Sequence, residues 1–417
     1  MGTRLRILWF SNIAFTEQQM SSTGTWIVGM ASALQTYYSN NVSLYNITQA
    51  SIAKVLHEKA GGIEQWILPC IDVLKKNDFV SITKQIHSII DSIKPNLIHI
   101  WGTEAYWGML PFGKMCPNIP VLLDMQGYVK SVVDNYYGDL TLTELLKCIS
   151  IKELLKPSSS LYAYKLRYKK QAKLESGIIN KMVNISVQSD WMEACIKSEN
   201  EHCRIFRTGI ALRNMFYQAE KWNFSDNKEP IIFTTASLSM PLKGLSVLLK
   251  AFVIVKKYYP NAVLYIAGFE QKGIRECGYS RLLKSYMKEE EIVSSVKYLG
   301  ALKTDELIKM YQKCSLFVNP SMIESYSLVV AEAMALGVPT VATYAGAMCE
   351  LGIHGSSILH FPKGDYIICA TQIMKILENP DLAISLSDRA RKEALKRNEI
   401  ESIAHNQYVI YCELLKM

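Results

Sequence analysis

The sequence has few of the residue patterns that mark metal-binding, membrane-spanning or disulfide-bonded proteins. Its ten cysteines are scattered from Cys70 to Cys412, with no Cys-x-x-Cys pair and no clustering with histidine, which argues against a zinc site and a disulfide framework. No Asp-x-Asp triplet occurs, and no apolar run reaches the roughly 18 residues that a membrane-spanning helix needs. We therefore expect a protein of the reducing cytoplasm that uses no metal and no separate cofactor.

The net charge of +8 is concentrated in one segment. Between Lys152 and Lys181 the chain carries eight basic and two acidic residues. One interpretation is a solvated helix face. The other is a peripheral membrane contact through residues 152–181, whose basic side chains would meet anionic lipid head groups. No aromatic-and-basic platform for single strands accompanies the segment, so we expect no nucleic acid partner.

Short β-branched or aromatic runs alternate with helical patterns along the whole chain. The strand candidates are residues 5–10, 42–47, 96–101, 121–125, 183–187 and 204–207 in the first half, and 231–235, 263–267, 296–299, 316–319, 340–343 and 358–361 in the second. Helical patterns between them include residues 25–37, 82–93, 245–258 and 304–312. This alternation predicts an α/β protein with parallel sheets. Two such series in 417 residues predict two Rossmann-like domains that face each other across a cleft.

The polar stretch from Lys221 to Pro230 is the expected seam between these domains. We therefore assign residues 1–222 to an N-terminal Rossmann-like domain and residues 223–398 to a C-terminal one. Residues 399–417 are expected to form a final helix, with its helical pattern from Ile400 to Leu415.

Two glutamates eight residues apart, Glu324 and Glu332, mark the most informative segment. The apolar run 316–318 precedes them and Pro320 ends it, which is typical of a buried strand. Gly337 and Pro339 close the helical pattern that follows. Ser325 or Ser327 can cap this helix. Its free N-terminal amides suit the phosphate of a ligand, and the two glutamates would bind the hydroxyl groups of the same ligand.

This segment resembles the Glu-x7-Glu signature of retaining glycosyltransferases of family 4 (glycosyl transferases group 1), which have the GT-B fold. The likeness continues through residues 335–350, where the family has a Gly-Gly-x-x-Glu ending. It is also found upstream, at Lys243-Gly244 and at the run 264–268. The resemblance implies that residues 1–222 bind the acceptor, that residues 223–398 bind the nucleotide sugar, and that the final helix crosses back onto the N-terminal domain.

The resemblance also implies roles for individual residues. Lys243 would bind the donor diphosphate, Glu324 would be catalytic beside the donor sugar, and Glu332 would accept hydrogen bonds from the ribose. The remaining expected contacts to the nucleotide sugar are the amides of Ser325, Tyr326, Ser327 and Leu328, together with Ser237, Gly24 and Gln126. The simpler alternatives are a solvated Lys243, a Glu332 paired inside the core, and a Glu324 that offsets the helix dipole.

Three positions depart from the family pattern. Ser237 stands where the family usually has an arginine, Gln126 where many relatives have a histidine, and Ser327 where a glycine is usual. Gln126 can bind a sugar hydroxyl but cannot act as a general base. Charge on a leaving diphosphate would then depend on Lys243 and backbone amides.

The expected function is a metal-independent, hexosyltransferase-like retaining transfer from a nucleoside-diphosphate sugar, with a UDP-sugar favoured. The acceptor would be a glycan or lipid-linked glycan in surface polysaccharide biosynthesis at the inner face of the membrane. Two alternatives remain open. One is a non-catalytic partner that binds nucleotide or glycan, suggested by Ser237 and Gln126. The other is a sugar-nucleotide epimerase.

Overall fold

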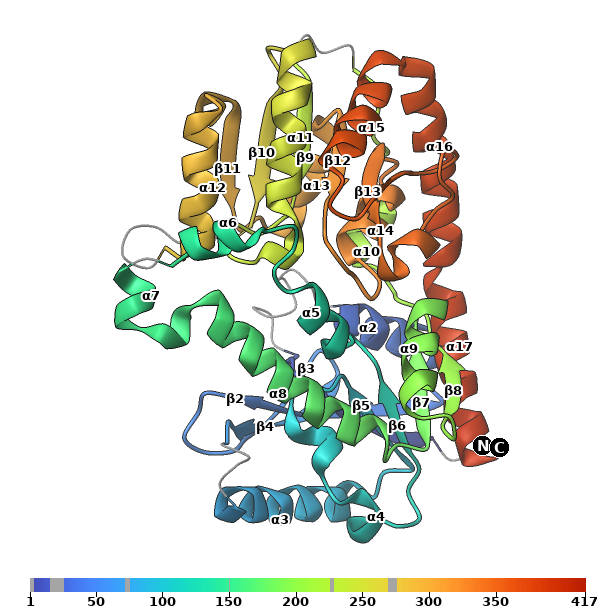
Figure 1. The fold of residues 1–417 in the computed structure, drawn as a ribbon. Coiled ribbons are helices and arrows are strands. Elements are labelled where there is room, and N and C mark those ends of the chain that lie inside the picture. The colour runs from blue at the N-terminus through green and yellow to red at the C-terminus, as the bar shows by residue number, and fades with distance from the viewer. Residues whose placement is uncertain (1–3, 16–25, 72–75, 150, 226–228, 269–275) are drawn as a thin grey trace. The chain divides into compact units, whose positions relative to one another are not determined.

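The computed structural model describes residues 4–15, 26–71, 76–149, 151–225, 229–268 and 276–417. The chain divides into two compact units (Figure 1). The first contains residues 1–127, 173–213 and 398–417, and the second contains residues 128–172 and 214–397. Each unit has its own sheet, so the predicted fold class of two Rossmann-like domains is confirmed.

The division of the chain differs from the expected bounds 1–222, 223–398 and 399–417. The chain passes into the second unit at Asn214, and residues 128–172 also belong to that unit. Polar contacts hold this segment there, because Asp139 accepts hydrogen bonds from Ser246 and Lys250 and Glu153 is paired with Arg281. Such long-range pairs leave no periodic pattern in the sequence.

The first unit contains an eight-stranded sheet. Its order is β3-β4-β2-β1-β5-β6-β7-β8, and all neighbours are parallel except β3 and β4. The strands are β1 (Leu5–Phe10), β2 (Val42–Ala50), β3 (Leu56–Ala60), β4 (Ile63–Pro69), β5 (Leu97–Trp101), β6 (Val121–Asp124), β7 (Asn184–Val187) and β8 (Arg204–Arg207). The β3–β4 hairpin was not predicted.

Helices cover both faces of this sheet. Figure 1 shows α3 and α4 on one face and α2 on the other. The helices are α2 (Trp26–Tyr38), α3 (Lys76–Ile93), α4 (Phe112–Met115), α9 (Asp190–Glu199) and α17 (Ile400–Leu415). The last helix has the predicted bounds and packs on the first unit, where the Tyr411 hydroxyl bonds Nδ1 of buried His99 at 2.9 Å and accepts from Trp9. The expected return of this helix is thereby confirmed.

The second unit contains a six-stranded, fully parallel sheet. Its order is β11-β10-β9-β12-β13-β14. The strands are β9 (Ile231–Thr234), β10 (Val263–Ala267), β11 (Val296–Gly300), β12 (Leu316–Asn319), β13 (Thr340–Tyr344) and β14 (Leu359–Pro362). Each coincides with a predicted strand to within a residue at either end.

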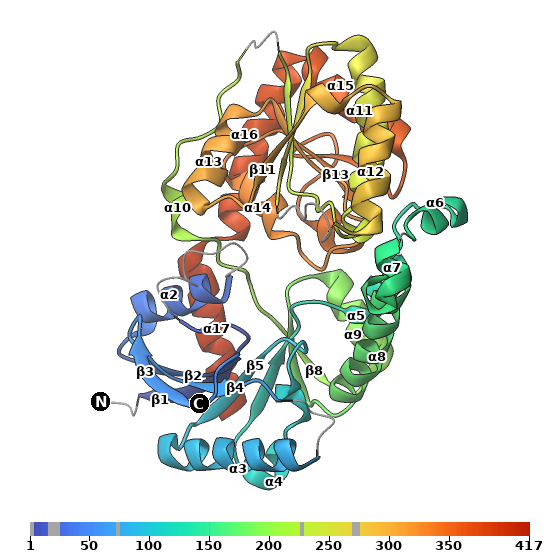
Figure 2. The same cartoon turned by 90° about the vertical axis from the view of Figure 1, so that its left-hand side faces the viewer.

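Figure 2 shows this second sheet edge-on between two helical layers, with α11, α12 and α15 on one face and α13, α14 and α16 on the other. The helices are α5 (Val129–Asn135), α6 (Leu142–Lys147), α7 (Ile151–Leu155), α8 (Leu161–Ile179), α10 (Asn214–Gln218), α11 (Leu245–Tyr258), α12 (Gly278–Glu289), α13 (Thr304–Lys313), α14 (Leu328–Ala335), α15 (Tyr366–Glu378) and α16 (Pro380–Arg397). The division between units falls within α8. Across the described ranges, no helix is both long enough and apolar enough to span a bilayer.

Candidate functional site

The chain reverses its direction of travel across the second sheet between β9 and β12. From β9 it proceeds to β10 and β11 on one side, and then returns to β12, which lies on the other side of β9. The connections that leave β9 and β12 therefore run onto opposite faces. Open parallel sheets bind ligands outside the carboxyl ends of their strands at such a point. The loops after these two strands, together with α14, carry those residues predicted for the donor that belong to the second unit.

Lys243 ends a single 3₁₀ turn, Pro241–Lys243, just before α11. Gly244 follows it with φ of 68°, a left-handed conformation that favours glycine. A Cβ atom there would lie 1.8 Å from the Pro320 carbonyl oxygen. The amide of Met322 donates to the Leu242 carbonyl oxygen at 2.9 Å. Close backbone contact therefore fixes the β9 loop against the β12 loop.

Lys243 and Glu324 form an ion pair across these two loops. The distance from Lys243 Nζ to Glu324 Oε1 is 2.7 Å, and the side chains are 36% and 18% exposed. The geometry brings together the expected diphosphate-binding lysine and the expected catalytic glutamate. An anionic ligand that reaches the ammonium group must share it with this carboxylate.

The main chain of Glu324 is held by the loop that follows β13. The amide of Ala347 donates to the Glu324 carbonyl oxygen at 2.9 Å. At Gly346, φ is 58° and a Cβ atom would lie 2.2 Å from that same oxygen. The segment that resembles the Gly-Gly-x-x-Glu ending of the family thus positions Glu324, and a larger residue at Gly346 would displace it.

Ser327 is the residue at the N-terminus of α14. Its backbone is left-handed, with φ of 73°, and its side chain makes no hydrogen bond that caps the helix within the described structure. The Ser327 hydroxyl instead accepts from Asn319 Nδ2 at 2.7 Å. The expected capping by Ser325 or Ser327 side chains is therefore wrong for Ser327. The first-turn amides, beginning at Leu328, are not occupied by that hydroxyl.

The remaining predicted residues of this unit lie around the same loops. Glu332 is in the second turn of α14 and is 4% exposed. The Ser237 hydroxyl bonds the Ser239 hydroxyl at 2.8 Å and accepts from the Ser239 amide at 3.1 Å, so it shapes the turn after β9. The Tyr326 hydroxyl accepts from Arg397 Nε at 3.3 Å. Arg397, at the end of α16, is a cation beside this loop that no sequence motif indicated.

Two predicted residues belong to the first unit. Gly24 lies outside the described residues. Gln126 is half-buried and follows β6, where its side chain lies beside the left-handed turn at Gly102. Asp124, at the end of the same strand, is buried and accepts from Ser186 and Gln188 at 2.6 and 2.8 Å. Burial raises the pKa of Asp124 to about 7.

In the described part of this site, metal-ligating side chains do not gather. Among the residues that the structure describes, no group of three or more His, Cys, Asp or Glu side chains is placed to hold a metal ion. The cation that the geometry supplies beside Glu324 is Lys243.

Most of the second unit is similar to a known protein family. Residues 218–393 match the family model described as Glycosyl transferases group 1. Over 158 residues the chain is 30% identical to D-inositol 3-phosphate glycosyltransferase of Corynebacterium urealyticum, a match that covers 37% of each protein. The chain spans less than half the length of the first curated relatives that it matches.

Solved structures resemble the chain over nearly its whole length. Sucrose-phosphate synthase of Thermosynechococcus elongatus has a TM-score of 0.71 at 17% identity, covering 99% of this chain and all of that one. HepE of Anabaena, in complex with UDP and glucose, has a TM-score of 0.66 at 14% identity and covers 98% of both chains. At such identities the likeness concerns the fold. The chain thus has the two Rossmann-like domains of the GT-B fold, and its residues 218–393 are similar to the glycosyl transferases group 1 family.

Proposed function

We propose that the protein is a retaining, hexosyltransferase-like glycosyltransferase. It would move a sugar from a nucleoside-diphosphate donor to a glycan or lipid-linked glycan. The observation that carries this proposal is the pairing of Lys243 with Glu324 at the switch point of the second sheet. Lysine and the first-turn amides of α14 suit a diphosphate, because both present positive charge to it. A carboxylate beside them suits the hydroxyls of a donor sugar.

UDP is the favoured nucleotide. A fold relative is described as a complex with UDP and glucose, and Glu332 lies one turn inside the helix whose N-terminus would face the diphosphate. Glu332 would then accept from the ribose hydroxyls. Surface polysaccharide synthesis at the cytoplasmic face of a membrane, with the basic segment 152–181 as the contact, is the proposed setting.

Transfer would proceed on one face of the sugar. The bond from the anomeric carbon to the diphosphate oxygen breaks, the acceptor oxygen bonds that carbon on the same face, and the departing diphosphate takes the acceptor proton. Lys243 would stabilise the charge that develops on the diphosphate, and Glu324 would hold the sugar and support its positive charge. Positioning and charge stabilisation would supply the rate, with no protein nucleophile and no metal.

The test combines binding with product analysis. A thermal-shift panel of nucleoside diphosphates and their sugars identifies the donor, because a ligand that binds only the folded protein raises its unfolding temperature. Transfer to a glycan or lipid-linked acceptor with retained anomeric configuration is the expected result. Conversion of the donor alone to another sugar nucleotide would favour an epimerase. Binding without any turnover would favour a non-catalytic partner.

A further inference from the structure

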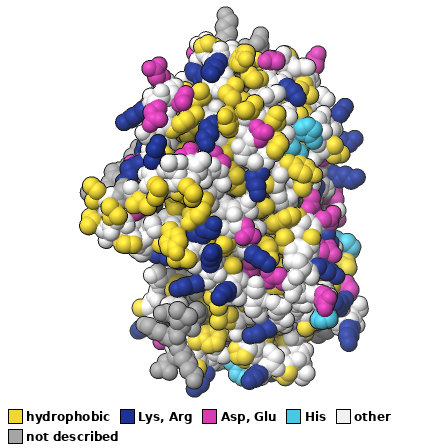
Figure 3. Space-filling model, in the orientation of Figure 1, with side chains coloured by type: hydrophobic (Ala, Val, Ile, Leu, Met, Phe, Trp, Pro, Cys, Tyr) yellow, Lys and Arg dark blue, Asp and Glu magenta, His cyan; other side chains and the backbone are white. Residues whose placement is uncertain are grey.

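An exposed apolar surface covers the helical segment 142–162 of the second unit. We define this α6–α8 apolar surface by its exposed members Leu142, Leu146, Ile149, Ile151, Leu154, Leu155 and Tyr162. Leu142 and Leu155 are each 82% exposed. Figure 3 shows hydrophobic side chains gathered over this part of the molecule, with lysine and arginine beside them. Contiguous exposure of so many large apolar side chains on a water-soluble domain indicates a binding surface.

A pocket of about 570 Å³ opens within the same surface. Its walls are almost entirely apolar and include Tyr137, Leu145, Leu146, Leu154 and Leu161. A pocket with so few polar groups cannot orient a sugar or a nucleotide through hydrogen bonds. Its apolar lining is suited to a hydrocarbon chain, which needs no hydrogen-bond partner.

The charge of the segment that carries this surface is predominantly positive. Residues 142–173 include eight Lys and Arg but only two acids, Glu144 and Glu153. Both acids form ion pairs with other helices of the unit. Glu144 pairs with Lys250 of α11 at 3.6 Å, and Glu153 pairs with Arg281 of α12 at 2.8 Å. Within the described structure, no acidic side chain forms an ion pair with the exposed lysines, which are Lys147, Lys156, Lys169, Lys170 and Lys173.

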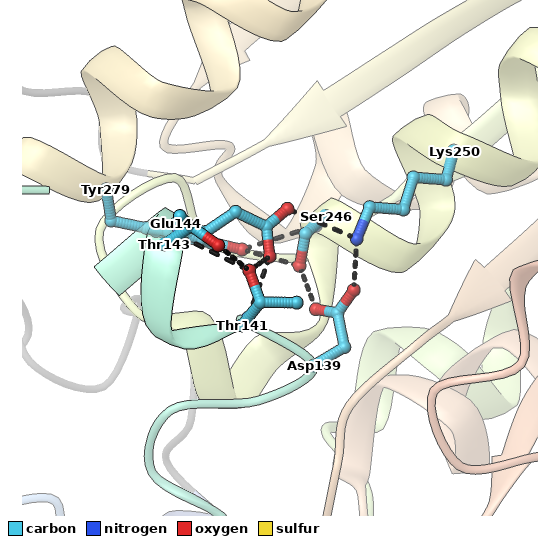
Figure 4. A network of polar contacts seen from close by, with 7 residues as sticks. All are labelled: Asp139, Thr141, Thr143, Glu144, Ser246, Lys250 and Tyr279. Carbon is cyan, nitrogen blue, oxygen red and sulfur yellow. Dashed lines mark hydrogen bonds and ion pairs between the residues drawn. The ribbon is translucent and has the colours of Figure 1, made fainter. Parts of the chain in front are cut away.

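A polar network fixes the segment to the helix that follows Lys243 (Figure 4). Asp139 accepts from Ser246 in the first turn of α11 and from Lys250 at 2.8 Å in the second. Thr141 caps α6, with a capping box completed by Glu144. The apolar surface therefore has a defined position on the second unit, and the network joins it to the first turn of α11, near the donor site.

We propose that the α6–α8 apolar surface inserts into an anionic phospholipid bilayer. Apolar side chains flanked by unpaired lysines provide the two signals, hydrocarbon burial and attraction to acidic head groups, that together give stable interfacial binding. A second copy of the chain is a poorer occupant, because its own excess of positive charge would face the same lysines. The inference rests on the membrane setting given with the proposed function and deepens it, since it names the apolar surface that enters the bilayer. It does not depend on catalysis.

The test measures binding of the full chain to phosphatidylcholine vesicles with and without phosphatidylglycerol. The apolar variant is L146S/L154S/L155S, and its matched control is V293S/I353S/I367S, three exposed aliphatic residues elsewhere on the same unit. The charge variant is K147Q/K156Q/K169Q, with K288Q/K309Q/K392Q as its control at exposed positions. Thermal unfolding and light scattering on every variant check folding and oligomeric state.

We expect the apolar variant to bind phosphatidylglycerol vesicles at least about tenfold more weakly, at low and at high salt, because hydrocarbon burial is not screened. The charge variant should lose binding by at least about tenfold at low salt only. Both controls should bind like the parent. Unchanged binding of the apolar variant would overturn the proposal, as would an apolar variant that converts a dimeric parent to monomers. Donor hydrolysis in solution, without vesicles, tests the proposed function separately.

Discussion

Lys243 Nζ and Glu324 Oε1 lie 2.7 Å apart, although 81 residues separate them in the sequence. Lys243 follows β9 and Glu324 follows β12, and these strands are neighbours in the sheet. The ammonium group therefore has a carboxylate partner that a diphosphate must displace or share. Because Glu324 competes with the diphosphate for Lys243, we expect it to lower the affinity for the nucleotide. We expect the same residue to raise turnover.

Glu324→Gln should bind free nucleoside diphosphate more tightly but transfer sugar more slowly. Removal of the competing charge should lower the dissociation constant of UDP by roughly two- to fivefold, since a partly exposed ion pair contributes on the order of 0.2–1 kcal/mol. Turnover should fall by roughly a hundredfold or more, the scale of one lost charge stabiliser. Calorimetry and steady-state kinetics measure both quantities. The exposed Glu378→Gln is the control, and weaker UDP binding by Glu324→Gln would contradict the competition.

Lys243 and Glu332 should affect different kinetic constants. Lys243→Ala should reduce turnover by roughly two orders of magnitude or more, because negative charge on the departing diphosphate grows in the transition state. Glu332→Gln should mainly raise the Michaelis constant of the donor, because the ribose does not react and its contacts are equal in ground and transition states. Steady-state kinetics on variants that are shown to fold measure both constants. Lys309→Ala, at an exposed position, is the control and should leave both unchanged. Normal turnover by Lys243→Ala would refute the phosphate assignment.

Gly244→Ala should destabilise the second unit far more than Gly355→Ala. Both glycines are left-handed, with φ of 68° and 76°, so both substitutions cost about 1–2 kcal/mol in backbone strain. At Gly244 the new Cβ would also lie 1.8 Å from the Pro320 oxygen, whereas at Gly355 nothing lies within 4 Å. Overlap with backbone should bring the total above about 3 kcal/mol. The unfolding temperatures of both variants measure the difference. An equal decrease in the two variants would show that the loops after β9 and β12 move apart at little cost.

The sequence predicted regular elements better than it predicted contacts. Buried parallel strands such as Leu316–Asn319 are continuous apolar runs and were recognised directly. The β3–β4 hairpin was missed because β3 is almost wholly exposed and has no alternation, although Gly61-Gly62, both with positive φ, is a hairpin-turn signal.

Contacts between distant residues were beyond the sequence. The pairing of Lys243 with Glu324 depends on strand order, and Arg397 reaches Tyr326 from a helix with no motif of its own. The segment 128–172 joins the second unit through Asp139 and Glu153, whose partners are more than 100 residues away. Local patterns carry no information on such partners.

Removal of divalent metal should leave transfer intact. Lys243 and the first turn of α14 are placed to meet the diphosphate charge that a metal ion neutralises in other transferases. Activity in excess chelator should remain within about twofold of the untreated rate, a difference of less than about 0.5 kcal/mol in the barrier. The assay compares chelated protein with protein to which manganese is restored. A complete loss that manganese reverses would assign the charge stabilisation to a metal.

Asp124 should make the folded protein less stable as the pH rises. Burial raises its pKa from 3.8 to about 7, so between these values the folded protein keeps a proton that the unfolded chain releases. The contribution of this proton to stability is complete below about pH 4 and is lost as the pH rises through about 7.

Asp124→Asn removes this titration while keeping a polar side chain beside Ser186 and Gln188. Relative to the parent, the variant should therefore gain stability between about pH 5 and about pH 8. Unfolding temperatures of both proteins at the two pH values measure the gain, and the exposed Asp381→Asn serves as the control. A difference between variant and parent that does not change with pH would mean that Asp124 is ionised in the folded protein throughout this range.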